Sequence, residues 1–329
     1  MSQVSADELP ELSVILLTPD DFRTIRRTMR HLRAQTARER IEVVIVAPSR
    51  AGLGAAPEEL EGFRRCVVVE VGEVSVVARA KAAGVWEARA PFVAFAEDHC
   101  FPAPGWAGSL IKAHREGWAA VGPAMRNANP RTMISWAGLL LHFGCCVEPA
   151  ATGEAQSLPW HNTSYRRDLL TPYGDALASM LIVEGMLFDE LKAAGHKLYF
   201  EQSAAAYHVN ISRLSSWVTH AFWGGRLFGA TRARQKRWTR RRRLLYACAA
   251  PLIPPLRLWR ALGDIRRKGL QRELVPRVLP AMLAGLIPHA VGEAAGYALG
   301  VGSAERRYSY FEVARTRHVT DEDRRDLES

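Results

Sequence analysis

The first two hundred residues alternate between short apolar runs and amphipathic segments. Four runs are almost continuously hydrophobic, as is typical of strands buried on both faces: residues 13–17, 41–46, 66–71 and 92–96. Between them, the spacing of apolar residues predicts a helix over Phe22–Arg33, and an alanine-rich segment predicts another over Val76–Ala88. This alternation predicts an α/β fold, Rossmann-like, with a mostly parallel, doubly wound sheet and helices on both faces.

The pattern changes near residue 212. We expect residues 1–212 to form one domain, with a donor-binding half at about 12–105 and an acceptor-binding half at about 106–212. Residues 213–329 are expected to form a helical amphipathic and apolar region that ends in a solvated tail.

Two apolar runs follow the boundary, at residues 244–259 and 278–304. A spanning helix needs about 20 apolar residues. The first run is short and rich in proline, whereas Pro280, Pro288 and Glu293 interrupt the second. Both are predicted to be interfacial or re-entrant helices. Two alternatives stay open, namely that the second run spans the membrane or that the whole region is a soluble helical subdomain.

The net charge of +10 is unevenly distributed. Residues Arg226–Arg277 hold sixteen Lys and Arg against two acidic residues, so the rest of the chain is acidic. Arginines beside apolar, Trp-bearing segments favour an anionic membrane surface, where each cation contributes about 1 kcal/mol. Nucleic-acid binding is the alternative for an arginine tract, but the prolines and apolar runs favour lipid, so no nucleic-acid partner is predicted.

Five scattered cysteines show no spacing typical of a disulfide scaffold or a zinc module, which fits a reducing compartment. The first residues are acidic where a signal peptide has basic ones, so a cytosolic start is expected. Together with the basic segment, this predicts a cytoplasmic protein that is peripheral or shallowly inserted at the cytoplasmic side of the inner membrane.

The strongest chemical motif is Glu97-Asp98-His99, which directly follows the run at 92–96. Carboxylate oxygen and imidazole nitrogen suit Mn²⁺ or Mg²⁺. In an extended segment, Glu97 and His99 point to the same side while Asp98 points away. A metal here would neutralise a diphosphate leaving group. The alternative is an acidic N-cap for the helix after Pro104.

Three segments, in this order, resemble glycosyltransferase family 2 of the GT-A fold: SVILLTPDD, IEVVIVAPS and ARAKAAGVWEARAPFVAFAEDHCFPAPGW. The resemblance runs from Leu12 to about Asn210. It implies a hexosyltransferase-type enzyme that transfers a sugar from a nucleotide-sugar donor with inversion. The Glu97–His99 triplet falls where the family has DxD, so the resemblance implies that Glu97 and Asp98 contact the nucleotide sugar and that Glu97 and His99 bind the metal.

The chain departs from the family pattern on the donor side. Ala47 stands where the family often has a base-binding Asp, and Lys81-Ala82 replaces Arg-Asn. The remaining candidates for nucleotide-sugar contacts follow the first strand or open the second predicted helix: Thr18, Asp20, Asp21, Arg79 and Lys81. The nucleobase is not fixed by these residues, and UDP is the favoured nucleotide.

The family supplies its catalytic base from a Glu-Asp pair in the pattern EDxxLxxRLxxxG. Here Glu184 matches the Glu, Gly185 replaces the Asp, and Gly195 keeps its place before a strand predicted at Lys197–Glu201. We expect Glu184 to be the base, with Asp189 as second choice. The alternative is that Glu184 only complements the dipole of the helix that it starts.

Acceptor contacts are predicted in the segment WHNTSYRR, which resembles a family motif that borders the acceptor pocket: Trp160, Asn162, Tyr165 and Arg166. Core packing is the alternative role for Tyr165. His208 follows a late apolar run and is a candidate third metal ligand, with burial in the core as its alternative.

The predicted function is therefore a membrane-associated, metal-dependent glycosyltransferase of cell-envelope polysaccharide biosynthesis. Its acceptor is expected to be a lipid-linked saccharide or a cell-surface polysaccharide precursor. Gln235–Trp238 is one residue short of the QxxRW motif of processive synthases, which favours transfer of a single sugar. The alternative is a catalytically degenerate GT-A domain that acts as a membrane-bound nucleotide-binding scaffold, because Ala47, Ala82, His99 and Gly185 replace preferred family residues.

Overall fold

The computed structural model describes residues 9–328, which form two compact units. The first comprises the chain up to Arg126 together with Ala150–Tyr207, and the second comprises Asn127–Pro149 together with the chain from His208 onward. The single boundary predicted at residue 212 therefore differs from the observed division. The reason is α6 (Met133–Phe143), which buries Ala137 and Leu140 in the same apolar cluster as Trp217 and Ile265 of the second unit.

The sheet of the first unit is built around four parallel strands, which confirm the predicted runs to within one residue at each end: β1 (Leu12–Leu17), β2 (Ile41–Ala47), β3 (Arg65–Glu70) and β4 (Phe92–Ala96). β1 lies between β2 and β4, with Ile15 opposite both Val44 and Phe95. All of β1 and β2 is buried, as their continuous hydrophobicity predicts.

The remaining strands extend the sheet in the order β3-β2-β1-β4-β8-β6-β9-β5, with β7 paired to β9. Their bounds are β5 (Cys100–Pro102), β6 (Ala120–Asn127), β7 (Gly153–Ala155), β8 (Ser164–Arg166) and β9 (Leu198–His208). β8 pairs antiparallel with both β4 and β6, and β7 pairs antiparallel with β9. The sheet is thus mixed rather than mostly parallel, because β8 enters it antiparallel between β4 and β6.

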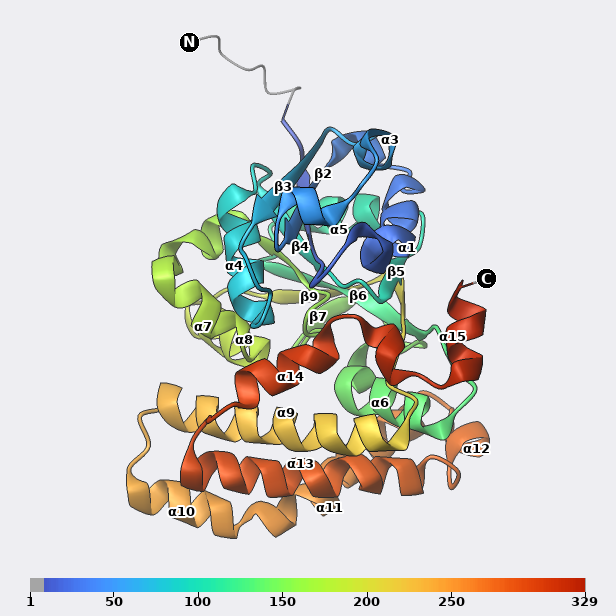
Figure 1. The fold of residues 1–329 in the computed structure, drawn as a ribbon. Coiled ribbons are helices and arrows are strands. Elements are labelled where there is room, and N and C mark those ends of the chain that lie inside the picture. Colours follow the sequence, from blue (N-terminus) through green and yellow to red (C-terminus); the bar gives the residue numbers. More distant parts are fainter. Residues whose placement is uncertain (1–8, 329) are drawn as a thin grey trace. The chain divides into compact units, whose positions relative to one another are not determined.

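Helices lie on both sides of the parallel strands, with α4 (Val77–Glu87) on one side and α1 (Phe22–Arg33) on the other (Figure 1). The Asp21 carboxylate begins α1 by accepting the backbone N–H of Arg23 at 2.9 Å. α4 packs closely on β1, because a Cβ at Gly84 would lie 2.5 Å from Cγ2 of Ile15. The other helices of this unit are α2 (Arg50–Leu53), α3 (Pro57–Leu60), α5 (Trp106–Arg115), α7 (Leu177–Leu181) and α8 (Glu184–Ala193).

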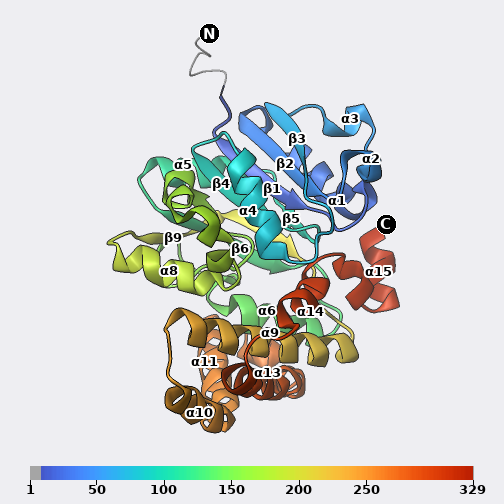
Figure 2. The same ribbon diagram turned by 60° about the vertical axis from the view of Figure 1, so that its left-hand side comes forward.

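The second unit is helical, as predicted for the C-terminal region. Besides α6 it contains α9 (Leu214–Gln235), α10 (Arg240–Cys248), α11 (Ile253–Arg267), α12 (Gln271–Leu274), α13 (Leu279–Leu299), α14 (Ala304–Glu312) and α15 (Asp321–Glu328). Helices α9, α10, α11 and α13 lie side by side (Figures 1 and 2). Short 3₁₀ helices occur in both units: η2 (Arg38–Arg40), η3 (Gly144–Cys146), η4 (Arg167–Leu169), η5 (Thr171–Ala176), η6 (Ala250–Leu252) and η7 (Arg315–His318).

Glycines allow α9 and α13 to pack backbone against backbone. Gly225 and Gly229 on α9 face α13, whereas Gly292 and Gly296 on α13 face α9. A Cβ at Gly292 would lie 2.0 Å from the carbonyl oxygen of Phe222, and one at Gly296 would lie 2.3 Å from that of Arg226. Small residues four apart on both helices are what permit so close an approach.

Of the helices within residues 9–328, none is both long enough and apolar enough to cross a membrane. One expectation for the C-terminal region is corrected. The final residues do not form a solvated tail. They form α15, where Asp323 is buried and accepts a hydrogen bond from Nδ2 of Asn129 at 3.2 Å.

The close packing of α9 on α13 predicts that a Gly→Ala substitution destabilises the protein at Gly292 but stabilises it at Gly263. Gly292→Ala should lower the free energy of unfolding by about 2–3 kcal/mol, because the added methyl group overlaps the Phe222 carbonyl. Gly263→Ala on α11 is the control, since its Cβ meets only the end of the Arg267 side chain at 3.4 Å. It should raise the free energy by up to about 1 kcal/mol through helix propensity. Urea denaturation measures both, and equal effects would contradict the packing.

His114 predicts acid sensitivity of the first unit. It is 2% exposed, lies against the Phe92 ring and bonds to Oγ of Ser164 at 2.8 Å. Burial lowers the pKa of His114 to about 4. As the pH falls from about 6.5 to about 4, the unfolded chain therefore takes up a proton that the folded chain does not. The free energy of unfolding falls by about 3 kcal/mol over this pH range. Urea denaturation at pH 7 and 4 should show a smaller loss for His114→Asn, and an unchanged loss would contradict this origin.

Candidate active site

The Glu97–His99 triplet lies in the turn between β4 and β5, and all three side chains are buried. The Thr28 hydroxyl on α1 stabilises this turn, because it lies 3.1 Å from the backbone carbonyl oxygens of both Glu97 and Asp98 and donates a shared hydrogen bond to them. The strand and the helix together fix the backbone from which the three side chains project.

Within the first unit, Nε2 of His99 lies 3.6 Å from Oε1 of Glu97. His208, the last residue of β9, belongs to the second unit. The structure therefore brings together Glu97 and His99, two of the three residues that were predicted as metal ligands, and the role of His208 stays a prediction. Metal binding itself stays a prediction.

Each of these three side chains has a polar partner that orients it. Nδ2 of Asn162 donates to Oε2 of Glu97 at 2.7 Å, and Nδ1 of His99 lies 2.5 Å from Oδ1 of Asp98. Nδ1 of His208 lies 2.9 Å from Oδ1 of Asn210. Because the carboxylate and the amide oxygen only accept, both imidazoles donate from Nδ1 and keep the Nε2 lone pair for a ligand.

This donor set fits a divalent cation. A carboxylate oxygen together with an imidazole nitrogen suits Mn²⁺ better than Mg²⁺, which prefers oxygen ligands. The expectation that Asp98 points away from its neighbours is wrong, since its carboxylate contacts the ring of His99. The turn after β4 is tight enough for consecutive side chains to meet.

A second cluster surrounds the carboxylate of Glu184 at the start of α8. Its Oε1 accepts from Nζ of Lys81 and from the backbone N–H of His161, both at 3.0 Å. Its Oε2 accepts from the Tyr165 hydroxyl at 2.8 Å. Glu184, Lys81 and Tyr165 are at most 1% exposed. These contacts join α4, β8, α8 and the loop before β8 through one carboxylate.

This environment corrects the role predicted for Glu184. Burial alone would raise the pKa of its carboxyl group, but the Lys81 ammonium and the bonds from His161 and Tyr165 hold that pKa at about 2. A carboxylate with so low a pKa and with both oxygens bonded is a weak general base. Lys81 is corrected as well: its ammonium binds Glu184 and lies 4.6 Å from the centre of the Phe95 ring, so it is occupied inside the unit rather than presented to a phosphate.

Asp189, the second choice for the base, does not fare better in this geometry. Gly185 stands where the family resemblance places an Asp, and a Cβ there would lie 2.8 Å from the Trp160 ring. Trp160 therefore fills the space of the missing side chain. Asp189 is directed to solvent on α8 and pairs with Lys192 at 3.3 Å, with 68% of its side chain exposed.

The predicted acceptor residues separate into different environments. Tyr165 is fully buried between Phe95 and Phe188 and binds Glu184, so it belongs to the core and cannot touch an acceptor. Asn162 is engaged with Glu97, whereas Trp160 is partly exposed beside Gly185. Arg166 pairs with Asp168 at the end of β8, at 2.5 Å.

The predicted nucleotide contacts after β1 form a compact turn. Thr18 is buried and donates to the backbone carbonyl of Asp21 at 2.9 Å. Asp20 accepts from the Thr24 hydroxyl at 2.5 Å, and Asp21 pairs with Arg23. Arg79 is exposed on α4. Their nucleotide contacts stay predictions, but Asp21 has a structural role as the N-cap of α1.

Two residues of this region were missed by sequence reasoning. His161 has a φ of +68°, a conformation rare for a residue with a side chain, and its Nδ1 lies 2.7 Å from Nζ of Lys81. The same Nδ1 lies 3.2 Å from Oε1 of Glu184, so this ring nitrogen sits between the ammonium and the carboxylate. Asn210 orients His208. His161 lies within the segment singled out for acceptor contacts, but no sequence pattern signals its backbone conformation.

The buried ion pair makes Lys81→Met strongly destabilising. It leaves the Glu184 carboxylate without its cation, and breaking a buried pair from one side costs about 3–5 kcal/mol. Lys192→Met is the matched control, because its partner Asp189 is exposed and such pairs contribute about 0–1 kcal/mol. In urea denaturation the double variant Lys81→Met/Glu184→Gln should lose less free energy of unfolding than the two single variants lose together. Additive losses would show that the two residues do not interact.

Comparison with known proteins matches part of the chain to a known family. A family model described as glycosyl transferase family 2 matches residues 13–170. The chain is similar to the structure of GalNAc-T7 with UDP, GalNAc and Mn²⁺, at 14% identity and a TM-score of 0.47 over 61% of this chain and 44% of that one.

A second similar structure is residues 1–349 of S. aureus TarS in complex with UDP. It shares 16% identity and a TM-score of 0.45, over 87% of this chain and 90% of that one. The chain covers 44% of the GalNAc-T7 chain, which is less than half of its length. No curated protein matches the chain. The family match, over the β1–β4 strands and the Glu97–His99 turn, confirms the predicted resemblance to glycosyltransferase family 2 for residues 13–170.

Proposed function

We propose that the protein transfers a single hexosyl residue from a nucleotide-sugar donor, with inversion and with a divalent cation. The observation that carries the proposal is the pairing of Glu97 and His99 in the turn after β4, within the part of the chain that matches a glycosyltransferase family. UDP is the first nucleotide to test, and Mn²⁺ is the cation that a carboxylate with an imidazole favours.

The chain's own residues prepare this site in three ways. Asn162 and Asp98 fix the directions of the Glu97 carboxylate and the His99 ring, so the ligand atoms are oriented before a donor binds. Thr28 holds the turn to α1. When bound, the cation neutralises the charge of the departing diphosphate. The Glu184 carboxylate holds the backbone of His161, which lies next to Asn162 in the same loop.

The acceptor that we propose is a lipid-linked saccharide or a cell-surface polysaccharide precursor at the cytoplasmic side of the inner membrane. Support comes from the second unit, where exposed apolar side chains such as Trp259 lie close in sequence to arginines. A place in cell-envelope polysaccharide biosynthesis follows from such an acceptor.

A second candidate is a nucleotide-binding scaffold without turnover. One observation favours it: Gly185 and the Trp160 ring occupy the place of the family's catalytic carboxylate, while Glu184 is held at a pKa of about 2. Such a protein keeps the donor site and lacks the group that accepts the proton of the acceptor hydroxyl.

A thermal-shift experiment with UDP and UDP-sugars tests the donor site. With Mn²⁺, a ligand at one hundred times its Kd should stabilise the wild-type protein by about 2.7 kcal/mol, which raises its melting temperature by several degrees. Glu97→Ala and His99→Ala should abolish the Mn²⁺-dependent part of the shift. Glu61→Ala, an exposed carboxylate on the loop after α3, should retain it.

Two outcomes separate the candidates. Release of UDP from a UDP-sugar in the presence of Mn²⁺ supports the transferase, whereas a metal-dependent shift without turnover across a panel of donors supports the scaffold. A full shift in both Glu97→Ala and His99→Ala would contradict the metal assignment.

A further inference from the structure

Exposed large apolar side chains gather in the second unit, where α10, η6 and α11 follow one another. The positions Leu244, Leu245, Cys248, Leu252, Leu256 and Trp259 are all exposed. They recur every three or four residues, so they line one face of this helical segment. Leu245 is 66% exposed, Leu252 is 68% and Trp259 is 72%, which is costly for side chains of this size in water.

Arginines lie at both ends of this apolar face. Arg240–Arg243 form the first turn of α10, Arg260 follows Trp259 on α11, and Arg266 and Arg267 end α11. Between Arg240 and Arg267 there are eight arginines and one acidic residue, Asp264, which pairs with Arg267 at 2.5 Å. The segment therefore combines exposed apolar side chains with a strong positive charge.

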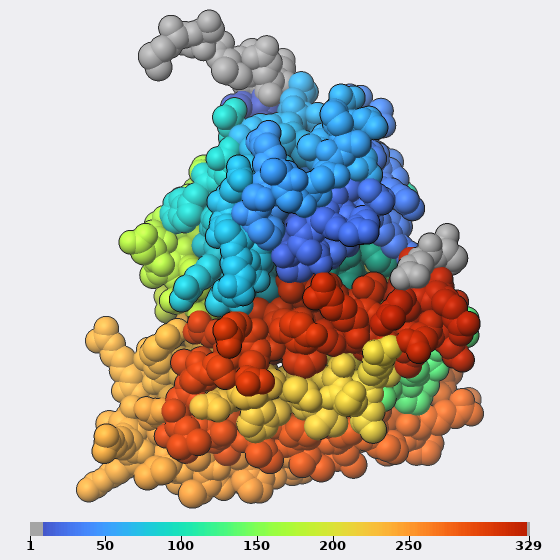
Figure 3. Space-filling model, viewed as in Figure 1, coloured from blue at the N-terminus to red at the C-terminus, as the bar shows by residue number. Residues whose placement is uncertain are grey.

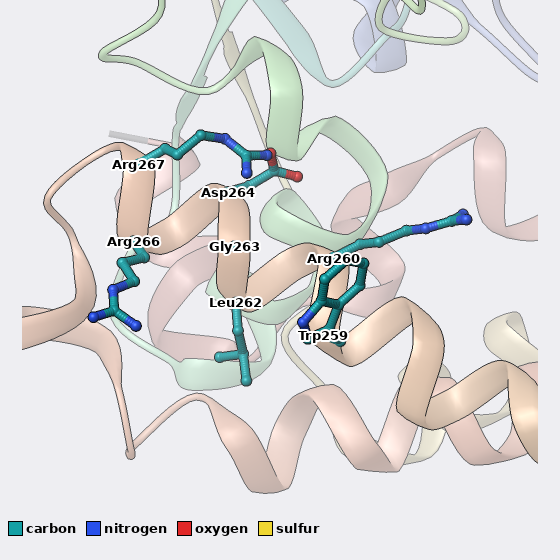
Figure 4. A pocket seen from close by; sticks show the side chains of 7 residues that line it. All are labelled: Trp259, Arg260, Leu262, Gly263, Asp264, Arg266 and Arg267. Atoms are coloured by element: carbon teal, nitrogen blue, oxygen red, sulfur yellow. The ribbon is translucent and has the colours of Figure 1, made fainter.

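A groove along α11 shows this combination at close range. Its volume is about 470 Å³, and Trp259, Leu262 and Arg266 extend from the same side of the helix (Figure 4). Arg267 turns toward Asp264, which leaves Arg260 and Arg266 as the cations of the groove. An apolar side chain next to an arginine suits the boundary between lipid chains and phosphate headgroups, and tryptophan is enriched at that boundary.

The neighbouring helix α13 has an apolar outer face as well. Leu283, Ile287 and Val291 are 38%, 53% and 57% exposed, and they lie on the side opposite to the glycines that contact α9. The charged residue of α13, Glu293, is buried and bonds to the Tyr297 hydroxyl at 2.6 Å. Figure 3 shows α13 and the orange α10–α11 segment at the surface of the second unit.

We propose that the exposed apolar face of α10–η6–α11, together with its arginines, docks onto an anionic lipid bilayer by shallow insertion. The apolar side chains enter the interface while the arginines contact lipid phosphates. This inference deepens the membrane location proposed above and does not depend on sugar transfer.

Two other partners fit the face less well. A second copy of the chain meeting the same face would set Arg240–Arg243 and Arg266 close to their own symmetry mates, which like charges oppose. Nucleic acid would use the arginines but would leave Leu245, Leu252 and Trp259 exposed beside polar phosphates. A bilayer is the partner that satisfies both parts of the surface.

Liposome flotation of the full chain tests the proposal. Vesicles of phosphatidylcholine with 30% phosphatidylglycerol should bind the protein, and neutral phosphatidylcholine vesicles should bind it at least tenfold more weakly. Leu252→Ser/Trp259→Ser should reduce binding to anionic vesicles about tenfold or more, because both side chains leave the interface. Arg241→Gln/Arg266→Gln should reduce it about twentyfold at low salt, since each cation contributes about fivefold.

Matched controls carry the same changes outside this face. Trp86→Ser on α4, where Trp86 is 46% exposed, and Arg38→Gln in η2 should leave flotation unchanged. Unchanged flotation of both double variants would overturn the proposal, as would equal binding to neutral and anionic vesicles.

The remaining outcomes also decide against a bilayer. Retention on RNA without flotation, or a dimer in light scattering that Trp259→Ser dissociates, would assign the face to another partner. Donor binding in the thermal-shift experiment is measured without lipid, so failure of docking and failure of the proposed transferase are distinguishable.

Discussion

The buried carboxylate of Glu184 is the interaction on which the first unit depends. It accepts hydrogen bonds from Lys81 on α4, from the backbone of His161 and from Tyr165 on β8, so one charge ties three segments to the start of α8. Burial of a lone carboxylate would cost several kcal/mol, and the Lys81 ammonium offsets that cost. The same contacts fix the loop that carries Asn162, and Asn162 in turn orients Glu97. Stability and the geometry of the candidate metal site are therefore coupled through a residue that touches neither metal nor donor.

This coupling explains why family motifs alone misassign some roles. Lys81 and Glu184 are charged residues at motif positions, and both were predicted to meet a ligand, but each neutralises the other inside the unit. Tyr165 is also occupied inside the unit, because its hydroxyl donates a hydrogen bond to the second carboxylate oxygen of Glu184. A sequence shows which residues are polar, whereas the assignment of partners requires knowing which segments meet.

Sequence reasoning predicted the parts of the fold that depend on local pattern. The buried strands and the Phe22–Arg33 helix follow from hydrophobic periodicity, and the Glu97–His99 turn follows from the rule that sites lie beyond the carboxyl ends of strands. The antiparallel β8, the transfer of α6 to the second unit and the docking of Asp323 on Asn129 could not be predicted, because each depends on contacts between residues far apart in the chain. The positive φ of His161 is likewise imposed by its surroundings.

The second unit resolves a conflict that the sequence left open. Residues 278–304 are apolar enough to suggest a membrane span, yet the glycines of α13 turn one side of that helix against the backbone of α9 and Glu293 is buried beside Tyr297. Packing within the unit thus buries one side of α13, and Leu283, Ile287 and Val291 remain exposed on the outside. The glycines that permit close packing therefore also decide which apolar side chains of α13 remain exposed.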